Sequence, residues 1–499
     1  MADESISSYE AMQSTGARVI KNTGILIATE LISRALGFGV LLVAARLLGA
    51  ANFGVLAFAY SLSELLSIAV VFGLDTVVVR TIARDAESPS VVLGRLIVIQ
   101  SVLALAVMLL IGMLLAQFEA DGTKRAVILI VASGYVAYSF TMTFNAFFRA
   151  HQLMSYEATV RLVFGLLRTV LVMSALMLGH GLFGYVVSEW TAYVVGLVVS
   201  FVILSRRIAK PAFSAALKSH WHFVRDAAPF AAMSGLVTIY VGSDTVLLSL
   251  LTSDEMTGWY AAATKFFFLF SFLPKAVIAA VLPVMARQYG GHGPQDQLLE
   301  TSRQTFRMLL IIGLPIAIGI AVLAEPIVLL VYGESFLPAA PVLRILMVAL
   351  LLGFANWACD STLIALNKER SLLRIVVVGV GFNIASNLLA IPFFGHIGAA
   401  MTTVASEGLV LLCKLFVISR VFEALPLGRN LVKPIVSGAI LVVFLVIGRS
   451  LPVLLLIIPA AAVYIGSLLL LRAFSATELR LVWMLLPLRR QERLTGPGQ

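Results

Sequence analysis

The sequence predicts an all-α membrane protein whose helices cross the lipid bilayer many times. Of its 499 residues, 60% are hydrophobic and only 12% are Asp, Glu, Lys or Arg, whereas roughly 25% of residues are charged in an ordinary soluble domain. Apolar segments of about 20 residues, the length that spans a bilayer as an α-helix, recur along nearly the whole chain. Lipid is therefore the solvent for most of this fold, and a water-soluble enzyme is excluded.

Fourteen spans follow from the apolar lengths and from the Gly, Pro and polar breaks between them. The first six are residues 20–47, 53–79, 93–118, 126–148, 159–178 and 183–204. The next six are residues 229–251, 259–285, 305–323, 343–366, 372–391 and 397–419. Two last spans are residues 434–447 and 452–471.

The polar segments between the spans divide the chain into five parts. Residues 1–205 and 229–419 are predicted to form two lobes of six helices each, and residues 420–473 add two more helices. The linker at 206–228 is amphipathic, with Phe213 and Trp221 on its apolar face, which is typical of a helix lying on the membrane surface. Residues 474–499 are predicted to be a cytoplasmic tail with a similar amphipathic helix.

The distribution of Lys and Arg predicts the orientation, because positively charged loops stay in the cytoplasm. With the N-terminus inside, nearly all loop Lys and Arg are cytoplasmic, and the opposite side receives only Arg46, Lys124, Arg125 and Arg449. The polar, acidic N-terminus does not resemble a cleaved signal peptide. We therefore expect a multi-pass membrane protein with both termini in the cytoplasm.

Ionisable residues within the predicted spans are the candidate functional groups. A charge at the bilayer centre costs at least about 2.5 to 3.5 kcal/mol on insertion scales, so it needs a partner or an aqueous cavity. Asp75 and Arg344 lie near span ends and are set aside, because such side chains reach water by snorkelling. The remaining acids are Glu30, Glu64, Glu189, Asp244, Asp360 and Glu407, and the remaining bases are Arg34, Arg168, Lys265, Lys275 and Lys414.

Spacing predicts partners for some of these charges. Glu30 and Arg34 are four residues apart on one helix, the favourable order for a same-face pair. Arg34 and Glu64 have comparable predicted depths in adjacent spans, and so do Asp244 and Lys265. These groups are either neutralised pairs that hold helices together or parts of a hydrated cavity.

Other features favour the cavity. Arg168 and Lys275 lie near mid-membrane with no evident local acid, which suits an anionic ligand. Polar stripes at helical spacing are predicted to line the same space, and they contain Tyr60, Glu64 and Ser67, then Asn356 and Asp360, then Asn383, Ser386 and Asn387.

Several kinds of chemistry lack their motifs. No GxxxxGK[ST] phosphate loop or HExxH zinc motif is present, and the two cysteines form no CxxC pair. The net charge of +10 is spread over loops beside spans rather than gathered on one soluble face, which argues against a nucleic-acid binder. We expect no catalytic residues, no metal and no organic cofactor.

The sequence resembles a known family. The segments that carry the resemblance are ARLLG at 45–49 with Phe53-Gly54, Asp244, GWYAA at 258–262, Leu282-Pro283, Tyr332-Gly333, Asn383 and Asn387, and IPFFGHIGAA at 391–400. They are similar to the polysaccharide-transporter branch of the multidrug/oligosaccharidyl-lipid/polysaccharide exporter superfamily. The stretch at 391–400 is shared with drug exporters, so it specifies the fold better than the substrate.

The resemblance implies two six-helix lobes in a V, alternating access, and a cationic cavity for an oligosaccharide linked to a polyprenyl (pyro)phosphate. It implies that Arg34 and Lys265 are cavity cations and that the last two helices form a groove for the lipid tail. Partners would be membrane lipids, a polysaccharide polymerase and glycosyltransferases. Because no ATP site exists, H⁺ or Na⁺ bound by the acids, or the membrane potential, would drive the cycle.

Other functions remain open at this point. A cation-coupled drug exporter is favoured if acids outweigh bases in the cavity, and a flippase for the peptidoglycan lipid precursor is a close alternative. A membrane-embedded glycan polymerase or ligase needs large catalytic outer loops, whereas the predicted outer loops, such as 252–258, are short.

Overall fold

The structure, a computed structural model, consists of α-helices joined by short connections. It describes residues 2–84, 86–119, 121–213, 217–290, 295–422 and 431–473, with the backbone alone at 2–35, 118, 217–219, 290 and 295. Among the described residues there is no β-strand, and 11 helices are long and apolar enough to cross a membrane. The predicted all-α, multi-pass membrane fold is confirmed.

Each of the predicted spans overlaps a helix, but some of them are joined. The first and most of the second lie in α1 (Ala2–Val71), which kinks at Gly49 with a φ of 73°, and the second span ends in the next helix. The eleventh and twelfth lie in α13 (Glu369–Phe422), which kinks at Gly395 with a φ of 55°. Glycine adopts such positive φ values without steric strain, so the chain changes direction there. The thirteenth is α14 (Val432–Gly448), whose 17 residues are short for a span, and the number of crossings stays a prediction.

The chain forms two compact units. The first contains Met1–Ala262, Val331–Pro338 and Val380–Thr402, and the second contains Ala263–Leu330, Ala339–Gly379 and Thr403–Gln499. The predicted lobe boundaries at 205 and 229 stay a prediction. The predicted tail at 474–499, with its amphipathic helix, lies outside the described residues.

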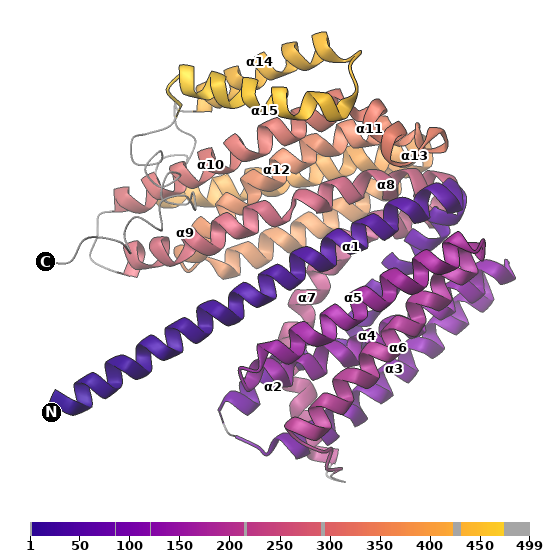
Figure 1. Ribbon diagram of the computed structural model, residues 1–499, viewed down its shortest axis with the longest axis vertical. Helices are drawn as coiled ribbons and strands as arrows, with labels where there is room; N and C mark the ends of the chain where they lie inside the picture. The colour runs from indigo at the N-terminus through magenta and orange to yellow at the C-terminus, as the bar shows by residue number, and fades with distance from the viewer. Residues whose placement is uncertain are drawn as a thin grey trace, which may run out of the picture. The chain divides into compact units, whose positions relative to one another are not determined.

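The first unit is built around α1 and six further helices. They are α2 (Leu74–Ala83), α3 (Pro89–Phe118), α4 (Gly122–Ala150), α5 (Met154–Met177), α6 (Gly181–Arg207) and α7 (Leu217–Leu251). Helices α4, α5 and α6 pack side by side (Figure 1). Much of the linker predicted at 206–228 belongs to α7, which begins at Leu217 and continues past Pro229.

Two apolar clusters form the core of this unit. One joins α1, α3, α4, α5 and α6, and the other lies where α2, α3 and α4 pack against α7. The segment 331–338 is fixed to the unit by hydrogen bonds. Tyr332 donates to the Ala262 carbonyl at 3.1 Å, and Trp259 donates to the Ser335 carbonyl at 2.9 Å. Burial raises the pKa of the Tyr332 hydroxyl, which keeps it protonated as a donor.

The remaining helices are α8 (Asp254–Phe270), which begins in the first unit, and α9 (Phe272–Gly290), α10 (Gln295–Val322), α11 (Ala324–Val331), α12 (Ala339–Ala365) and α15 (Val453–Leu470). In the second unit α12 packs on α9 and α10, while α14 and α15 form a hairpin against α10 (Figure 1). Tyr464 on α15 donates to the Ile311 carbonyl at 3.1 Å.

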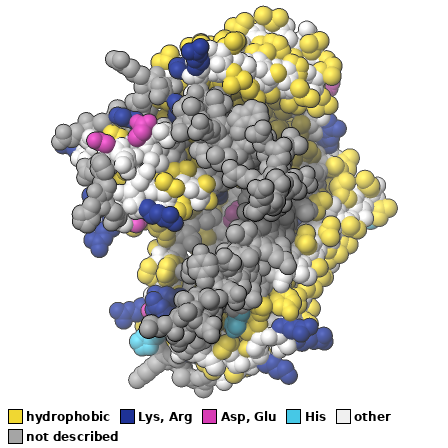
Figure 2. All heavy atoms as spheres, turned by 60° about the vertical axis from the view of Figure 1, so that its left-hand side comes forward, with side chains coloured by type: hydrophobic (Ala, Val, Ile, Leu, Met, Phe, Trp, Pro, Cys, Tyr) yellow, Lys and Arg dark blue, Asp and Glu magenta, His cyan; other side chains and the backbone are white. Residues whose placement is uncertain are grey.

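The exterior has the character of a lipid-facing surface. Hydrophobic side chains cover broad areas of the face in Figure 2, and Lys and Arg lie in separate groups. Exposed apolar residues such as Met113 and Phe393 are more than 70% accessible, which in water would be a liability. The bilayer explains this exposure.

Candidate functional site

A cavity lined by tyrosines lies inside the first unit, with walls from α1, α2, α4, α5, α6 and α7. It has a volume of about 440 Å³, and Tyr135, Tyr138 and Tyr193 form part of its wall. The rings contact one another: Tyr193 lies 5.8 Å from Tyr135 and 5.4 Å from Tyr138 between centroids, and Phe164 stacks on Tyr193 at 4.9 Å. The cavity therefore presents flat aromatic faces and hydroxyl groups to a ligand.

The polar stripe predicted on the second span faces this cavity in part. Glu64 is exposed, and both Glu64 and Ser67 lie in the cavity wall. Tyr60 packs against Tyr135 with ring centroids 6.0 Å apart. The Tyr60 hydroxyl is buried and has no hydrogen-bond partner among the described residues.

The pattern of charged residues in the sequence does not indicate the tyrosine cluster. A signal was available, because Tyr135 and Tyr138 are three residues apart and Ser139 and Met142 continue the same helical face. Tyr193 and Phe164 come from other helices, and no sequence spacing connects them to that face.

Arg168 on α5 pairs with Glu189 on α6. Its Nε lies 2.6 Å from Oε1 of Glu189, and the two side chains are 20% and 4% exposed. A second contact joins Arg168 to the Tyr185 hydroxyl at 3.4 Å. The expectation that Arg168 has no local acid is wrong, because tertiary packing brings together two residues that are 21 positions apart on different helices. Its charge is compensated within the protein.

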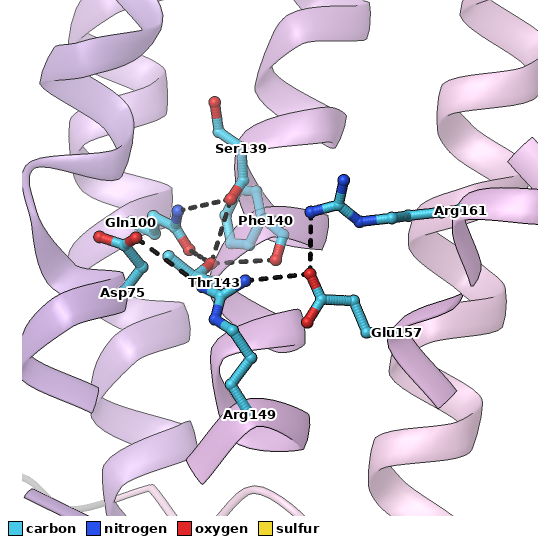
Figure 3. Close-up of polar contacts among 8 residues, drawn as sticks. All are labelled: Asp75, Gln100, Ser139, Phe140, Thr143, Arg149, Glu157 and Arg161. Atoms are coloured by element: carbon cyan, nitrogen blue, oxygen red, sulfur yellow. Dashed lines mark hydrogen bonds and ion pairs between the residues drawn. The ribbon is translucent and has the colours of Figure 1, made fainter. Parts of the chain in front are cut away.

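Beside the cavity, four charged residues form a chain of ion pairs, shown in Figure 3. Arg149 lies 3.9 Å from Asp75 and 3.1 Å from Glu157, and Arg161 lies 2.9 Å from the same Glu157 oxygen. Glu157 is 2% exposed, and the two guanidinium groups beside it compensate the charge that burial makes costly. Asp75, set aside as a residue near a span end, lines the tyrosine cavity as well.

A buried polar cluster joins α7, α8 and α13. Asn387 donates to Oδ1 of Asp244 at 2.7 Å, and the Tyr260 hydroxyl donates to Oδ2 at 2.9 Å. Thr402 donates to Asn387 at 2.6 Å, and Asn387 donates to Asn383 at 3.2 Å. The structure thus brings together three predicted residues, Asp244, Asn383 and Asn387, each at most 5% exposed. They form an internal network.

Two polar pairs lie in the second unit. Lys414 on α13 contacts Oδ1 of Asp360 on α12 at 2.7 Å. Asn356 on α12 donates to Oε2 of Glu407 on α13 at 2.7 Å and to its backbone carbonyl at 3.0 Å. These contacts link two helices, so Asp360 and Asn356 have a packing role whatever else they do.

Lys275 differs from the other predicted cations. It is exposed, no described carboxylate pairs with it, and its Nζ lies 5.5 Å from the centroid of the Trp357 ring. Lys265 lies half-buried on α8. The side chains of Glu30 and Arg34 lie outside the described residues, so their predicted pairing stays a prediction, as does that of Asp244 with Lys265.

Metal-ligating residues do not gather in the described part of the chain. Within it, no group of three or more His, Cys, Asp or Glu side chains is placed to hold a metal ion. The site chemistry visible here is that of aromatic, hydroxyl, amide and paired charged groups.

These features define a multi-pass helical membrane protein with polar clusters inside its helix bundles. The chain belongs to the polysaccharide biosynthesis protein family, whose profile matches residues 19–288. The MatE family profile also matches, over residues 229–389. The family resemblance seen in the sequence is thereby confirmed.

Individual relatives are distant. A membrane protein of Methanocaldococcus jannaschii is 25% identical over 409 residues, which cover 76% of this chain and 80% of the relative. A probable flippase of Haloferax volcanii, AglR, is 26% identical over 326 residues, covering 62% and 65%. Among solved structures, the lipid II flippase MurJ in an inward closed conformation has a TM-score of 0.73 at 14% identity, covering 88% of this chain and 97% of that one. That likeness concerns the fold alone.

Proposed function

We propose that this protein is a flippase that moves an oligosaccharide linked to a polyprenyl (pyro)phosphate across the cytoplasmic membrane. The observation that carries the proposal is the match of residues 19–288 to the polysaccharide biosynthesis protein family. Relatives named as probable flippases support it. A sugar pyrophosphate headgroup is too polar to cross hydrocarbon unaided, so polysaccharide assembly needs a protein for this step.

The side chains supply the chemistry that such a cargo needs. The faces of Tyr135, Tyr138 and Tyr193 offer platforms for the apolar faces of sugar rings. Lys275, with no described carboxylate beside it, supplies a cation for a phosphate group. Arg34 and Lys265 are the other proposed cations. Arg168 is left out because Glu189 compensates its charge.

Energy for the cycle would come from an ion gradient or the membrane potential. Glu64, an exposed acid in the cavity wall, is the proposed binding group for H⁺ or Na⁺. Asp244 is instead buried and accepts hydrogen bonds from Asn387 and Tyr260. Moving one charge through the membrane potential is worth about 2.3 kcal/mol per 100 mV, enough to bias an alternating-access cycle. No organic cofactor and no covalent catalysis enter this scheme.

The proposed setting is the cytoplasmic membrane of a bacterium, with both termini in the cytoplasm. This orientation follows from the Lys and Arg distribution. Glycosyltransferases would build the cargo on one side, and a polysaccharide polymerase would use it on the other. The peptidoglycan lipid precursor is an alternative cargo of the same chemical class.

A second candidate is a cation-coupled exporter of cationic drugs. It is favoured by Glu64 and Asp75, which both line the tyrosine cavity, and by the MatE match at 229–389. Aromatic rings with carboxylates suit a lipophilic cation.

One experiment separates the two functions. The purified full chain is placed in proteoliposomes, and movement of a fluorescent polyprenyl-pyrophosphate oligosaccharide is followed with and without an imposed H⁺ or Na⁺ gradient. We expect gradient-dependent movement, which is lost in Arg34→Ala and Lys265→Ala and kept in a control, Lys368→Gln, at an exposed loop position. Accumulation of a cationic dye without movement of the glycolipid would refute the flippase and favour the exporter.

A further inference from the structure

A second polar pocket lies in the first unit, where α2 ends and α3 and α7 begin. Its volume is about 340 Å³. The charged and titratable residues in its wall are Arg80, Arg84, Arg95, His222, Glu87 and Asp226. None of them lines the tyrosine cavity, so this pocket is distinct from the proposed transport site.

Arg95 is the buried element of this pocket. Its side chain is 6% exposed, one guanidinium nitrogen lies 2.8 Å from Glu87, and the group lies over the Phe223 ring at 5.5 Å. Its Nε is buried and has no hydrogen-bond partner among the described residues. A buried donor of a charged group that lacks an acceptor is costly, and a ligand oxygen in the pocket would satisfy it.

The pocket carries an excess of positive charge. Three guanidinium groups face two carboxylates. Arg80 and Asp226 are 3.8 Å apart and about half exposed, so their pair is weak. Arg84 is exposed and pairs with no described carboxylate. The Arg84 guanidinium and the Nε donor of Arg95, which Glu87 does not satisfy, are thus available to a bound anion.

A lipid-facing surface continues from this pocket along α3. Val98, Val102, Leu105 and Leu109 lie three, seven, ten and fourteen residues after Arg95, on the same helical face, and are 40 to 64% exposed. At the start of α7 Trp221 is 67% exposed, as is common for aromatic residues at the membrane interface. The pocket therefore lies at span ends, beside a surface suited to acyl chains.

We propose that this pocket binds the phosphate group of an anionic membrane lipid. Arg84 and Arg95 donate to the phosphate oxygens, and the acyl chains lie along the exposed apolar face of α3. Basic pockets between transmembrane helices are suited to anionic headgroups in this way. Free inorganic phosphate has the same anionic chemistry but would leave the α3 face without a role.

The test uses the purified full chain in detergent and measures dissociation constants by native mass spectrometry. The probes are dioleoyl phosphatidic acid, dioleoylglycerol, which lacks the phosphate, and inorganic phosphate. The variants are Arg84→Gln, Arg95→Gln and the control Arg207→Gln, an exposed arginine at the end of α6. Arg95→Gln leaves Glu87 without its partner and can impair folding. Arg84→Gln changes an exposed side chain, so it tests the site independently of that effect.

We expect phosphatidic acid to bind, dioleoylglycerol to bind far more weakly, and inorganic phosphate not to compete at millimolar concentration. Each removed charge should weaken phosphatidic acid binding about fivefold in Arg84→Gln and Arg95→Gln, with no change in Arg207→Gln. Unchanged binding in Arg84→Gln would overturn the site. Equal binding of the two lipids would overturn phosphate recognition, and full competition by inorganic phosphate would identify a free-phosphate site in place of the lipid site.

Discussion

Asn387 on α13 donates a hydrogen bond of 2.7 Å to the carboxylate of Asp244 on α7, 143 residues earlier in the chain. Both side chains are buried, Asp244 at 5% and Asn387 at 0% exposure. A buried acid needs hydrogen-bond donors around it, and Asn387 and Tyr260 provide them. Asn387, one of the residues that carry the family resemblance, is therefore a structural partner of the Asp244 carboxylate.

Replacing Asn387 by leucine should destabilise the fold. The change leaves the Asp244 carboxylate with one donor fewer in a buried site, and we expect a loss of about 1.5 to 3 kcal/mol in the free energy of unfolding. Denaturant titration of the purified protein in mixed micelles would measure it. The control is Ser386→Ala, because Ser386 is only half-buried and bonds within its own helix to the Asn383 carbonyl. Equal stability of Asn387→Leu and Ser386→Ala would contradict a structural role for the cluster.

The pair of Arg168 and Glu189 permits a double-mutant cycle. Glu189→Gln leaves a largely buried guanidinium without its counter-ion, and Arg168→Gln leaves a buried carboxylate, so each change should cost about 3 to 5 kcal/mol. The double variant should be less destabilised than the sum of the two, because neither charge remains. The contrary result would be additive losses in the free energy of unfolding, with transport abolished in Arg168→Gln but kept in Glu189→Gln. That result would assign Arg168 to substrate binding.

Gly54 and Gly258 allow close approach of two backbones. A Cβ on Gly54 would overlap the Asp254 carbonyl, and one on Gly258 would overlap the Ala50 carbonyl. Gly258→Ala should therefore displace α8 from α1 and sharply lower the yield of folded protein, measured by fluorescence-detected size-exclusion chromatography. Gly39→Ala is the matched control, since a Cβ there meets no atom within 4 Å, and alanine favours a helix. Wild-type yield from Gly258→Ala would show that the helices separate without penalty.

The fold was predictable because its signals are local. Apolar length and Gly or Pro breaks located the spans, and Gly49 and Gly395 are where the chain turns within α1 and α13. The same signals do not tell whether two spans form separate helices or one kinked helix. The start of α7 is a related case. The amphipathic pattern before Pro229 is typical of a surface helix, and the structure has one helix that runs from this segment into the span.

The site was less predictable because its partners lie far apart in sequence. A mid-membrane position suggested a role for Arg168, and Glu189 was a candidate acid, but only tertiary packing shows that the two are partners. The acids and amides were identified one by one, whereas the link between Asp244 and Asn387 exists only in the folded chain. The tyrosine cavity was not predictable from the charge pattern, because the three tyrosines in its wall are neutral and lie on two different helices.

Lys275 is the predicted cation whose removal should affect transport without unfolding the protein. It is exposed and contacts Trp357, and an exposed cation–π contact is worth only about 0.5 to 1 kcal/mol, so Lys275→Gln should keep the fold. A charge-assisted hydrogen bond to a phosphate contributes about 1.5 to 3 kcal/mol, which predicts a loss of roughly tenfold or more in glycolipid transport. Lys275→Arg should retain part of the activity because the charge remains, and Lys368→Gln controls for the loss of an exposed positive charge. The measurement is the initial rate of glycolipid movement in proteoliposomes, normalised to folded protein. A rate unchanged in Lys275→Gln would remove Lys275 from the substrate path and leave Arg34 and Lys265 as the cations to test.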